Sequence, residues 1–315
     1  MSATRTFSGA VAGLLMALAL ASPTPAFAMD KVRFSSATEA YRQGLEAYHA
    51  GLYDLAVPAL EYAARYGVLG AQLRLAKIYS TGEGVAQSDA KAFHYYQLIA
   101  DQYADTSPHH PIARYVAEAF IALAASYSKG ISELRVRPDL TRATGLLRHA
   151  ASYFGDPRAQ FKLAQMYLAG EGVPKNPRLA VNWLANASKK QHAPSQAVLG
   201  DLLWRGGKDV RRRPLKGLAL LSLARQNAEG TADQDWIETL QKRALAEAGA
   251  KQRESATEIL SRWRRRPDSV SVKTEKPAQS PEHTGSTGPA RTDGASTGEG
   301  SGASKAGSAA AANLR

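Results

Sequence analysis

A segment that occurs twice constrains the fold of this chain more than any other feature. Residues 70–85 read GAQLRLAKIYSTGEGV, and residues 158–173 read RAQFKLAQMYLAGEGV. Self-similarity of this kind is typical of arrays in which helical units stack side by side and bury a shared core. Such arrays usually hold a partner rather than perform chemistry, so the repeat bears on function as well as on fold.

The residues shared by the two copies predict a short helix followed by a tight turn. Alanine, leucine and tyrosine recur every four residues, which places them on one face of a helix. Two glycines then supply a turn that other residues enter only with backbone strain. These positions are Ala71, Leu75, Tyr79, Gly82 and Gly84 in the first copy and Ala159, Leu163, Tyr167, Gly170 and Gly172 in the second. We assign Tyr79 and Tyr167, together with Tyr127 of a divergent copy, to the core.

A second helix is expected directly after each turn. Ser88 and Asn176 stand where a side-chain oxygen can cap the free backbone N–H groups of that helix, and Pro177 suits its first turn. Its inner face again has helical spacing, with Ala92, Tyr95 and Ile99 in the first copy and Ala180, Trp183 and Ala187 in the other. The repeating unit is therefore predicted to be an antiparallel helix pair.

Divergent copies of the unit extend the array in both directions. Their markers are Leu123, Tyr127 and Gly130 in one copy and Leu199, Leu203 and Gly206 in another. We expect an all-α solenoid over residues 34–266. It comprises an opening pair at 36–67, repeats at about 70–102, 114–155, 158–191 and 195–228, and capping helices at 232–265.

The two ends of the chain differ in composition from the repeats. Residues 1–28 contain Arg5, an apolar run and a small-residue ending at Ala28, which is typical of a cleaved signal peptide and predicts a periplasmic protein. The chain has no cysteine, which excludes disulfides and thiol chemistry. Residues 267–315 are rich in Ser, Thr, Gly, Ala and Pro, and we expect a disordered tail there.

The formal net charge of +12 is concentrated in a few clusters near the end of the array. Export argues against nucleic acid as the partner, and leaves protein surfaces, anionic lipid and acidic polysaccharide, or no specific partner at all. A basic amphipathic helix at 253–263 either lies on a membrane or a partner, or covers the open end of the last repeat. For partner contact we select the cluster that interrupts the fourth turn: Arg211, Arg212, Arg213 and Lys216.

No pattern of catalytic, cofactor-binding or metal-binding residues is found. The G-E-G-V turns lack the lysine and hydroxyl that follow a phosphate-binding loop, and repetition favours a structural role for them. His109 and His110 lie in an insertion at 105–111, but no nearby residues complete a zinc pattern. Protonation of histidines in mild acid remains a way to loosen the array or its partner contact. We therefore predict a binding protein, not an enzyme.

The A-x-x-x-L-x-x-x-Y helix, the G-x-G-V turn and the alanine-rich second helix resemble the SEL-like repeat family of tetratricopeptide-like solenoids. The stretches GLLRHAASYFGDPRAQFKLAQMYLAGEGV and GLALLSLARQNA, with the opening pair and the insertion, further resemble the ExoR family of periplasmic negative regulators of exopolysaccharide production. That resemblance implies binding to the periplasmic portion of a membrane sensor histidine kinase, inhibition of it, and release by a periplasmic protease. Two other functions stay open, an envelope scaffold or adaptor and a direct binder of acidic polysaccharide.

Overall fold

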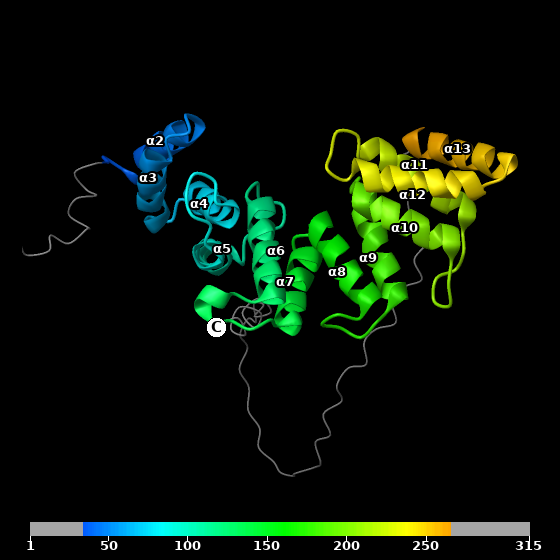
Figure 1. Cartoon of the computed structure of the whole chain (residues 1–315), viewed down its shortest axis with the longest axis horizontal. Helices are drawn as coiled ribbons and strands as arrows, with labels where there is room; N and C mark the ends of the chain where they lie inside the picture. The colour runs from blue at the N-terminus through cyan, green and yellow to red at the C-terminus, as the bar shows by residue number, and fades with distance from the viewer. Residues whose placement is uncertain (1–33, 266–315) are drawn as a thin grey trace, which may run out of the picture.

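The computed structural model describes residues 34–265, and these form a stack of antiparallel helix pairs, which confirms the predicted all-α solenoid (Figure 1). The proposed signal segment, Arg266 and the proposed tail lie outside the described residues. The opening pair is α2 (Ala37–His49) with α3 (Tyr53–Arg65). The four repeats are α4 (Leu69–Thr81) with α5 (Asp89–Tyr103), α6 (Ala113–Lys129) with α7 (Leu140–Ser152), α8 (Pro157–Ala169) with α9 (Pro177–Lys189), and α10 (Ala193–Arg205) with α11 (Pro214–Asn227).

The second helix of each of the first three repeats begins at a side-chain cap. Ser88 accepts a hydrogen bond from the backbone N–H of Lys91, and Asn176 accepts one from that of Leu179, as the sequence predicted. Asp139 caps α7 in the same way. A short polar side chain in this position satisfies a backbone donor that the first turn of a helix leaves free, and is worth about 1 kcal/mol. The fourth repeat has Arg213 there and lacks a side-chain cap.

The repeat residues lie in a core that runs through the whole stack. Adjacent pairs pack through alanine and leucine, and the buried positions predicted from the sequence include Ala71, Leu75, Ala159, Leu163 and Leu199. Tyr79 and Tyr127 are also buried, with 5% and 7% of their surface exposed. Trp183 packs at the junction of two hydrophobic clusters while remaining partly exposed.

Tyr167, which the sequence assigned to the core, packs against two hydrophobic clusters, while its ring stays partly exposed. In the first two repeats a cation at the third helical position of the second helix lies over the tyrosine ring, with Lys91 at 4.5 Å from the ring of Tyr79 and Arg142 at 4.3 Å from that of Tyr127. The corresponding residue of the third repeat is Leu179, which lacks the long cationic side chain that covers the other two rings.

Glycine is required in the turns for close approach as well as for backbone conformation. Gly84 has a φ of +71° and lies directly against the ring of Tyr53. Gly172 has a φ of +68°, and a Cβ atom there would stand 2.6 Å from the carbonyl oxygen of Leu140. Each turn therefore packs on the start of the second helix of the preceding pair, and any side chain would push the two pairs apart.

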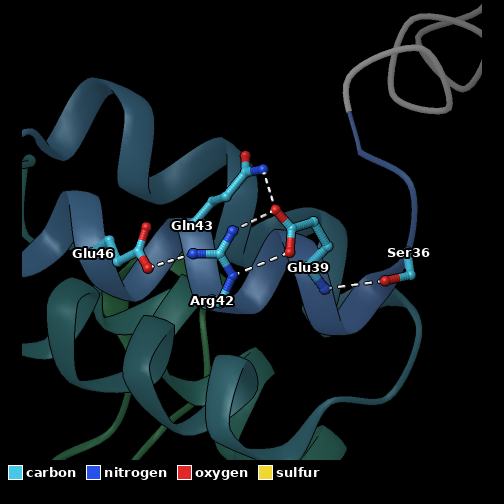
Figure 2. A network of polar contacts seen from close by, with 5 residues as sticks. All are labelled: Ser36, Glu39, Arg42, Gln43 and Glu46. Carbon is cyan, nitrogen blue, oxygen red and sulfur yellow. Dashed lines mark hydrogen bonds and ion pairs between the residues drawn. The ribbon is translucent and has the colours of Figure 1, made fainter.

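The opening helix α2 packs mainly on α3 and is stabilised on its outer face by local polar contacts (Figure 2). Ser36 caps the helix by accepting from the backbone N–H of Glu39 at 3.1 Å. Arg42 pairs with Glu39 at 2.7 Å and with Glu46 at 2.5 Å, and Gln43 also donates to Glu39. The Arg42 guanidinium lowers the pKa of the Glu39 carboxyl. Exposed pairs of this kind contribute little to stability, because solvent screens them, which suits a helix at the end of the array.

Two further helices cover the other end of the solenoid. α12 (Gln234–Glu247) and α13 (Ala250–Arg265) pack on the last repeat, and the indole N–H of Trp204 donates to Glu247 at 2.8 Å. The apolar face of α13 is buried through Ala256, Leu260 and Trp263. This helix therefore covers the last repeat, the second of the two roles considered from sequence. No helix within residues 34–265 has the length and apolar character needed to cross a bilayer.

Candidate partner-binding surface

The turns that join the two helices of each repeat lie together on one edge of the array, and we call them the hairpin turns. They span residues 82–88, 130–139, 170–176 and 206–213. Figure 1 shows those of the second, third and fourth repeats along the lower side of the molecule. A side chain that departs from the repeat pattern in one of these turns is therefore displayed on a common surface.

The carboxylate of the first hairpin turn is engaged within the molecule. Glu83 accepts hydrogen bonds from the hydroxyls of Tyr48 at 2.8 Å and Tyr53 at 3.1 Å. The hydrogen bond to Glu83 raises the pKa of each tyrosine. Arg74 lies over the ring of Tyr48 at 4.4 Å and contributes a nearby positive charge. The charge of this turn is thus satisfied inside the array, although Glu83 itself is exposed as predicted.

The second hairpin turn contains η1 (Ser132–Leu134) and reaches back to the preceding repeat. Glu133 accepts from the hydroxyl of Ser88 at 2.7 Å and from the backbone N–H groups of Asp89 at 3.1 Å and Ala90 at 3.4 Å. The hydrogen bond from Ser88 lowers the pKa of the Glu133 carboxyl. A carboxylate at a helix N-terminus is favoured by the free N–H groups and the helix dipole. This contact was not predicted from the sequence, because it joins residues 45 positions apart.

The fourth hairpin turn contains the arginines selected from the sequence, and the structure gives them different surroundings. Arg212 donates from Nε to the backbone carbonyl of Trp204 at 2.9 Å, and its guanidinium lies 5.8 Å from the Trp204 ring. The backbone N–H of Arg213 donates to the carbonyl of Leu203 at 2.8 Å. Arg211 is exposed, while Lys216 is partly buried in the first turn of α11 and interacts within the chain.

The positive charge of this turn is not neutralised within the described part of the chain. None of the three arginines at 211–213 forms an ion pair with a residue of 34–265. Neighbouring arginines differ in this respect, because Arg205 and Arg243 both pair with the buried carboxylate of Asp201. Arg243 reaches it from α12 at 2.9 Å and so fastens the capping helix to α10. The turn therefore presents cations that a partner carboxylate can neutralise.

The arginines at the end of α13 form a separate group. Since Glu247 bonds to Trp204, the end of α12 and the start of α13 lie beside the fourth hairpin turn. The exposed Arg262, Arg264 and Arg265 are at the other end of α13. The arginines of the fourth hairpin turn and those at the end of α13 therefore lie apart and do not form one patch.

The insertion before the second repeat borders a cavity on the opposite edge. The cavity has a volume of about 360 Å³, and its walls include His110, Arg114, Phe154 and Lys190. Asp156, which also lines the cavity, caps α8 and pairs with Arg158 at 3.1 Å. His109 and His110 do not belong to a metal-type cluster, since no group of three or more potential His, Asp or Glu ligands occurs among the described residues.

Two histidines are held in partly buried positions. Burial lowers the pKa of His149, against the opposing effects of the Ala104 carbonyl and the Asp105 carboxylate. Burial also lowers the pKa of His192, which caps α10 by accepting from the backbone N–H of Ser195 at 3.3 Å. An imidazole nitrogen can accept this hydrogen bond only when it carries no proton, so the neutral form belongs to the folded structure.

Comparison with known proteins agrees with the repeat pattern. The Sel1 repeat family matches residues 69–103 and 157–192, which are the two copies of the doubled segment with their second helices. An exopolysaccharide production negative regulator of Rhizobium leguminosarum bv. viciae is 37% identical over 248 residues, covering 78% of this chain and 90% of that protein. The regulator of the same description in Rhizobium meliloti (strain 1021) is 36% identical over 241 residues, covering 75% and 87%.

Among solved structures, a Sel1 repeat protein from Oxalobacter formigenes is similar over 60% of this chain and 70% of its own. The sequence identity is 22%, and the TM-score is 0.48.

Proposed function

This chain belongs to the family of exopolysaccharide production negative regulators, and we propose that it acts in the periplasm by binding the sensor portion of a membrane histidine kinase and holding it inactive. The observation that carries the proposal is its relation to those regulators over most of their length. The Sel1 repeat fold and the regulator relatives fit a protein that is not an enzyme.

The mechanism we propose is a shift of the kinase between two states. A ligand that binds the inactive state more tightly than the active one raises the inactive population in proportion to that preference. The helix pairs of the array supply a large, largely preformed surface for this purpose. No substrate turnover is needed, and removal of the regulator by a periplasmic protease would restore the active state.

The fourth hairpin turn is the proposed contact for acidic groups of the kinase. Arg211 and Arg213 carry charge without an ion pair in the described residues, and the bond from Arg212 to Trp204 fixes the path of the turn between them. Charged contacts at the rim of an interface mainly raise the association rate and are weakened by salt. Binding that depends on this turn should therefore weaken as ionic strength rises.

Deletion of the gene tests the proposed function in the cell. Exopolysaccharide output and kinase-dependent transcription should both rise, and expression of the full chain should restore them. The mature protein should retain the sensor kinase in a pull-down from solubilised envelopes. An unchanged response on deletion, together with no recovery of a kinase, contradicts the proposal.

The residues of the proposed contact are tested by charge reversal. The double variant Arg211→Glu, Arg213→Glu should lose binding while its thermal unfolding stays near that of the wild type. The matched control is Lys175→Glu with Arg178→Glu, because these two exposed cations lie at the neighbouring third turn. Equal binding by both double variants would show that the fourth turn is not the contact.

The same unpaired cations favour direct binding of acidic polysaccharide as a second candidate function. In that case the mature protein is retained on an acidic glycan column, elutes as salt is raised, and loses retention in the Arg211→Glu, Arg213→Glu variant. Deletion would then change the amount of bound polysaccharide without a change in kinase-dependent transcription.

A further inference from the structure

The second hairpin turn is held in one conformation by contacts at three points. Ile131 is 2% exposed and anchors its start in the core. The backbone of Ile131 bonds to that of Val136 in both directions, at 2.8 and 3.0 Å. Glu133 is fixed at the N-terminus of α5 by the contacts described above. A loop with these constraints keeps its shape without a partner.

The exposed side chains of this turn include one leucine and two arginines without an ion pair in the described residues. Leu134 is 47% exposed at the tip of the loop. Arg135 follows it with a φ of +55°, a left-handed conformation that costs a residue with a side chain about 1 to 2 kcal/mol. Arg135 and Arg137 are exposed, and neither forms an ion pair with the described residues. Backbone strain persists only where the surrounding structure imposes it, and it collects at functional sites.

Capping of α5 does not account for these features. The cap needs the carboxylate of Glu133, and it makes no use of the side chains of Leu134, Arg135 or Arg137. The first and third hairpin turns are closed by the G-E-G-V sequence without a raised loop. The longer second turn therefore exposes a leucine and two arginines that the cap of α5 does not require.

Other exposed apolar residues lie on the same edge of the array. Leu52 and Leu55 stand at the turn between α2 and α3, and Leu140 follows the second hairpin turn. The exposed large residues of the opposite edge, Tyr66 and Tyr153, are aromatic and amphipathic. Exposed aliphatic side chains and unpaired cations thus occur together along the hairpin turns.

We propose that residues 131–137 form a docking loop for a protein, in which Leu134 enters an apolar pocket of the partner and Arg135 and Arg137 pair with carboxylates around it. Interface hot spots are anchor side chains that fill a desolvated pocket and are surrounded by contacts that exclude water. The preformed loop limits the entropy lost on binding. Acidic polysaccharide supplies carboxylates but no apolar pocket, so the leucine selects a protein. The inference rests on the proposed function only in taking the sensor kinase as that protein.

The first test measures affinity for the purified sensor portion of the kinase. Leu134→Ser should weaken binding by about tenfold or more, as truncation of an anchor residue does. The control is Tyr153→Ser, because Tyr153 is 42% exposed on the opposite edge, and it should leave the affinity unchanged. Leu134→Ser should unfold at the wild-type temperature, and the affinity of Tyr153→Ser, which loses ring contacts with His149 and Phe154, is measured below its own unfolding temperature. Equal affinity of Leu134→Ser and the wild type would overturn the docking loop.

Arg135→Gly separates docking from a purely structural role. Glycine adopts a positive φ without strain, so this variant should unfold at a higher temperature than the wild type. If Arg135 pairs with a partner carboxylate, the same variant should bind more weakly. Higher stability with unchanged affinity would assign the arginine to the loop alone and contradict its docking role.

Cross-linking in living cells tests the loop without assuming the kinase. A photoreactive benzophenone amino acid replaces Leu134 in the full chain, and Tyr153 in a control chain. A cross-link at 134 but not at 153, to a peptide of the sensor kinase with apolar and acidic residues, supports the docking loop. A cross-link to another protein overturns docking of this loop on the kinase, while the proposed function, whose contact is the fourth hairpin turn, stands. No cross-link at 134, or one to polysaccharide alone, overturns the docking loop.

Discussion

Gln160 donates a hydrogen bond from its amide nitrogen to the backbone carbonyl of Ala151 at 3.1 Å, and so ties α8 to the end of α7. The same contact recurs in two other repeats, from Gln72 to Ala64 at 3.4 Å and from Gln196 to Ser188 at 3.1 Å. The last carbonyls of a helix have no partner within that helix. The glutamine amide therefore supplies a hydrogen-bond donor to such a carbonyl across the junction between successive helix pairs.

We expect Gln160→Ala to lower the free energy of unfolding by about 1 to 3 kcal/mol, because the buried carbonyl of Ala151 loses its donor. Urea denaturation measures the change. Gln165→Ala is the control, since Gln165 is exposed on the same helix and its replacement should alter stability by less than about 0.5 kcal/mol. Similar effects of the two substitutions would show that the contact contributes nothing to the junction.

The tyrosines of the first and third repeats should differ in their contribution to stability. Tyr79→Ala should cost about 3 to 5 kcal/mol, as for a large buried aromatic residue. Tyr79 also donates to Glu61 at 2.9 Å, which its replacement removes. Tyr167→Ala should cost about half as much or less, because that ring is partly exposed. Equal losses in urea denaturation would contradict the difference in burial.

Acid should destabilise the folded array through His149 and His192. Burial holds the pKa of each imidazole below its ordinary value of 6.5, so the unfolded chain takes up protons first as the pH falls. Stability is therefore full above pH 6.5 and is lost as the pH decreases toward the lower folded pKa values. Urea denaturation at pH 7.5 and pH 5 measures the loss.

A variant can separate the contribution of His192 from that of the other titrating groups. Asp156, Asp233 and Arg158 lie near this imidazole, and the two carboxylates favour its protonation. His192→Asn keeps a cap for α10 and removes the titration, so it should reduce the dependence of stability on pH. His94→Gln, at an exposed position, should leave the dependence unchanged. If the stability of His192→Asn depends on pH as strongly as that of the wild type, His192 does not contribute to the destabilisation by acid.

Alanine substitutions of Arg212 and Arg211 should affect the stability of the fold differently, because only Arg212 has a structural contact in the fourth hairpin turn. Arg212→Ala removes the hydrogen bond to the Trp204 carbonyl and the contact with its ring, and should cost about 1 kcal/mol. Arg211→Ala should change stability by less than about 0.5 kcal/mol. Thermal unfolding of the two variants measures the difference. A larger loss of stability in Arg211→Ala than in Arg212→Ala would contradict the structural role of Arg212.

Two glycines should respond to alanine in opposite directions. Gly172→Ala should destabilise by about 2 kcal/mol or more, because of its positive φ and the nearby Leu140 carbonyl. Gly145 lies within α7 with open space around its Cα, so Gly145→Ala should stabilise by about 0.5 to 1 kcal/mol. If Gly145→Ala also lost stability, the predicted gain from the higher helix propensity of alanine at this position would be wrong.

The repeat pattern predicted the helix pairs and two of their caps, since Ser88 and Asn176 act through neighbours that the sequence itself specifies. It did not predict the bond from Gln160 to Ala151, although the glutamine is part of the doubled segment. Periodicity identifies the face of a helix, whereas the partner of a buried polar group depends on where the preceding helix ends. The partial exposure of Tyr167 was not predicted for a related reason, because the cover of its ring depends on residue 179.

The candidate surface was predicted only in part. The arginines at 211–213 stood out as an exception to the repeat, but the division between Arg211 and Arg212 depends on the path of the turn. The loop at 131–137 was missed, because neither the positive φ of Arg135 nor the reach of Glu133 leaves a mark in the sequence.

The reach of Glu133 to the first turn of α5 has a consequence for how the array opens. In a solenoid each unit normally exchanges stability only with its neighbours through packed faces. Here the hydrogen bonds of Glu133 also join the first two repeats at their outer edge. Unfolding of the first turn of α5 therefore has to release the second hairpin turn as well. The two repeats should exchange their amide hydrogens as one cooperative unit, and Glu133→Gln should split that unit into two.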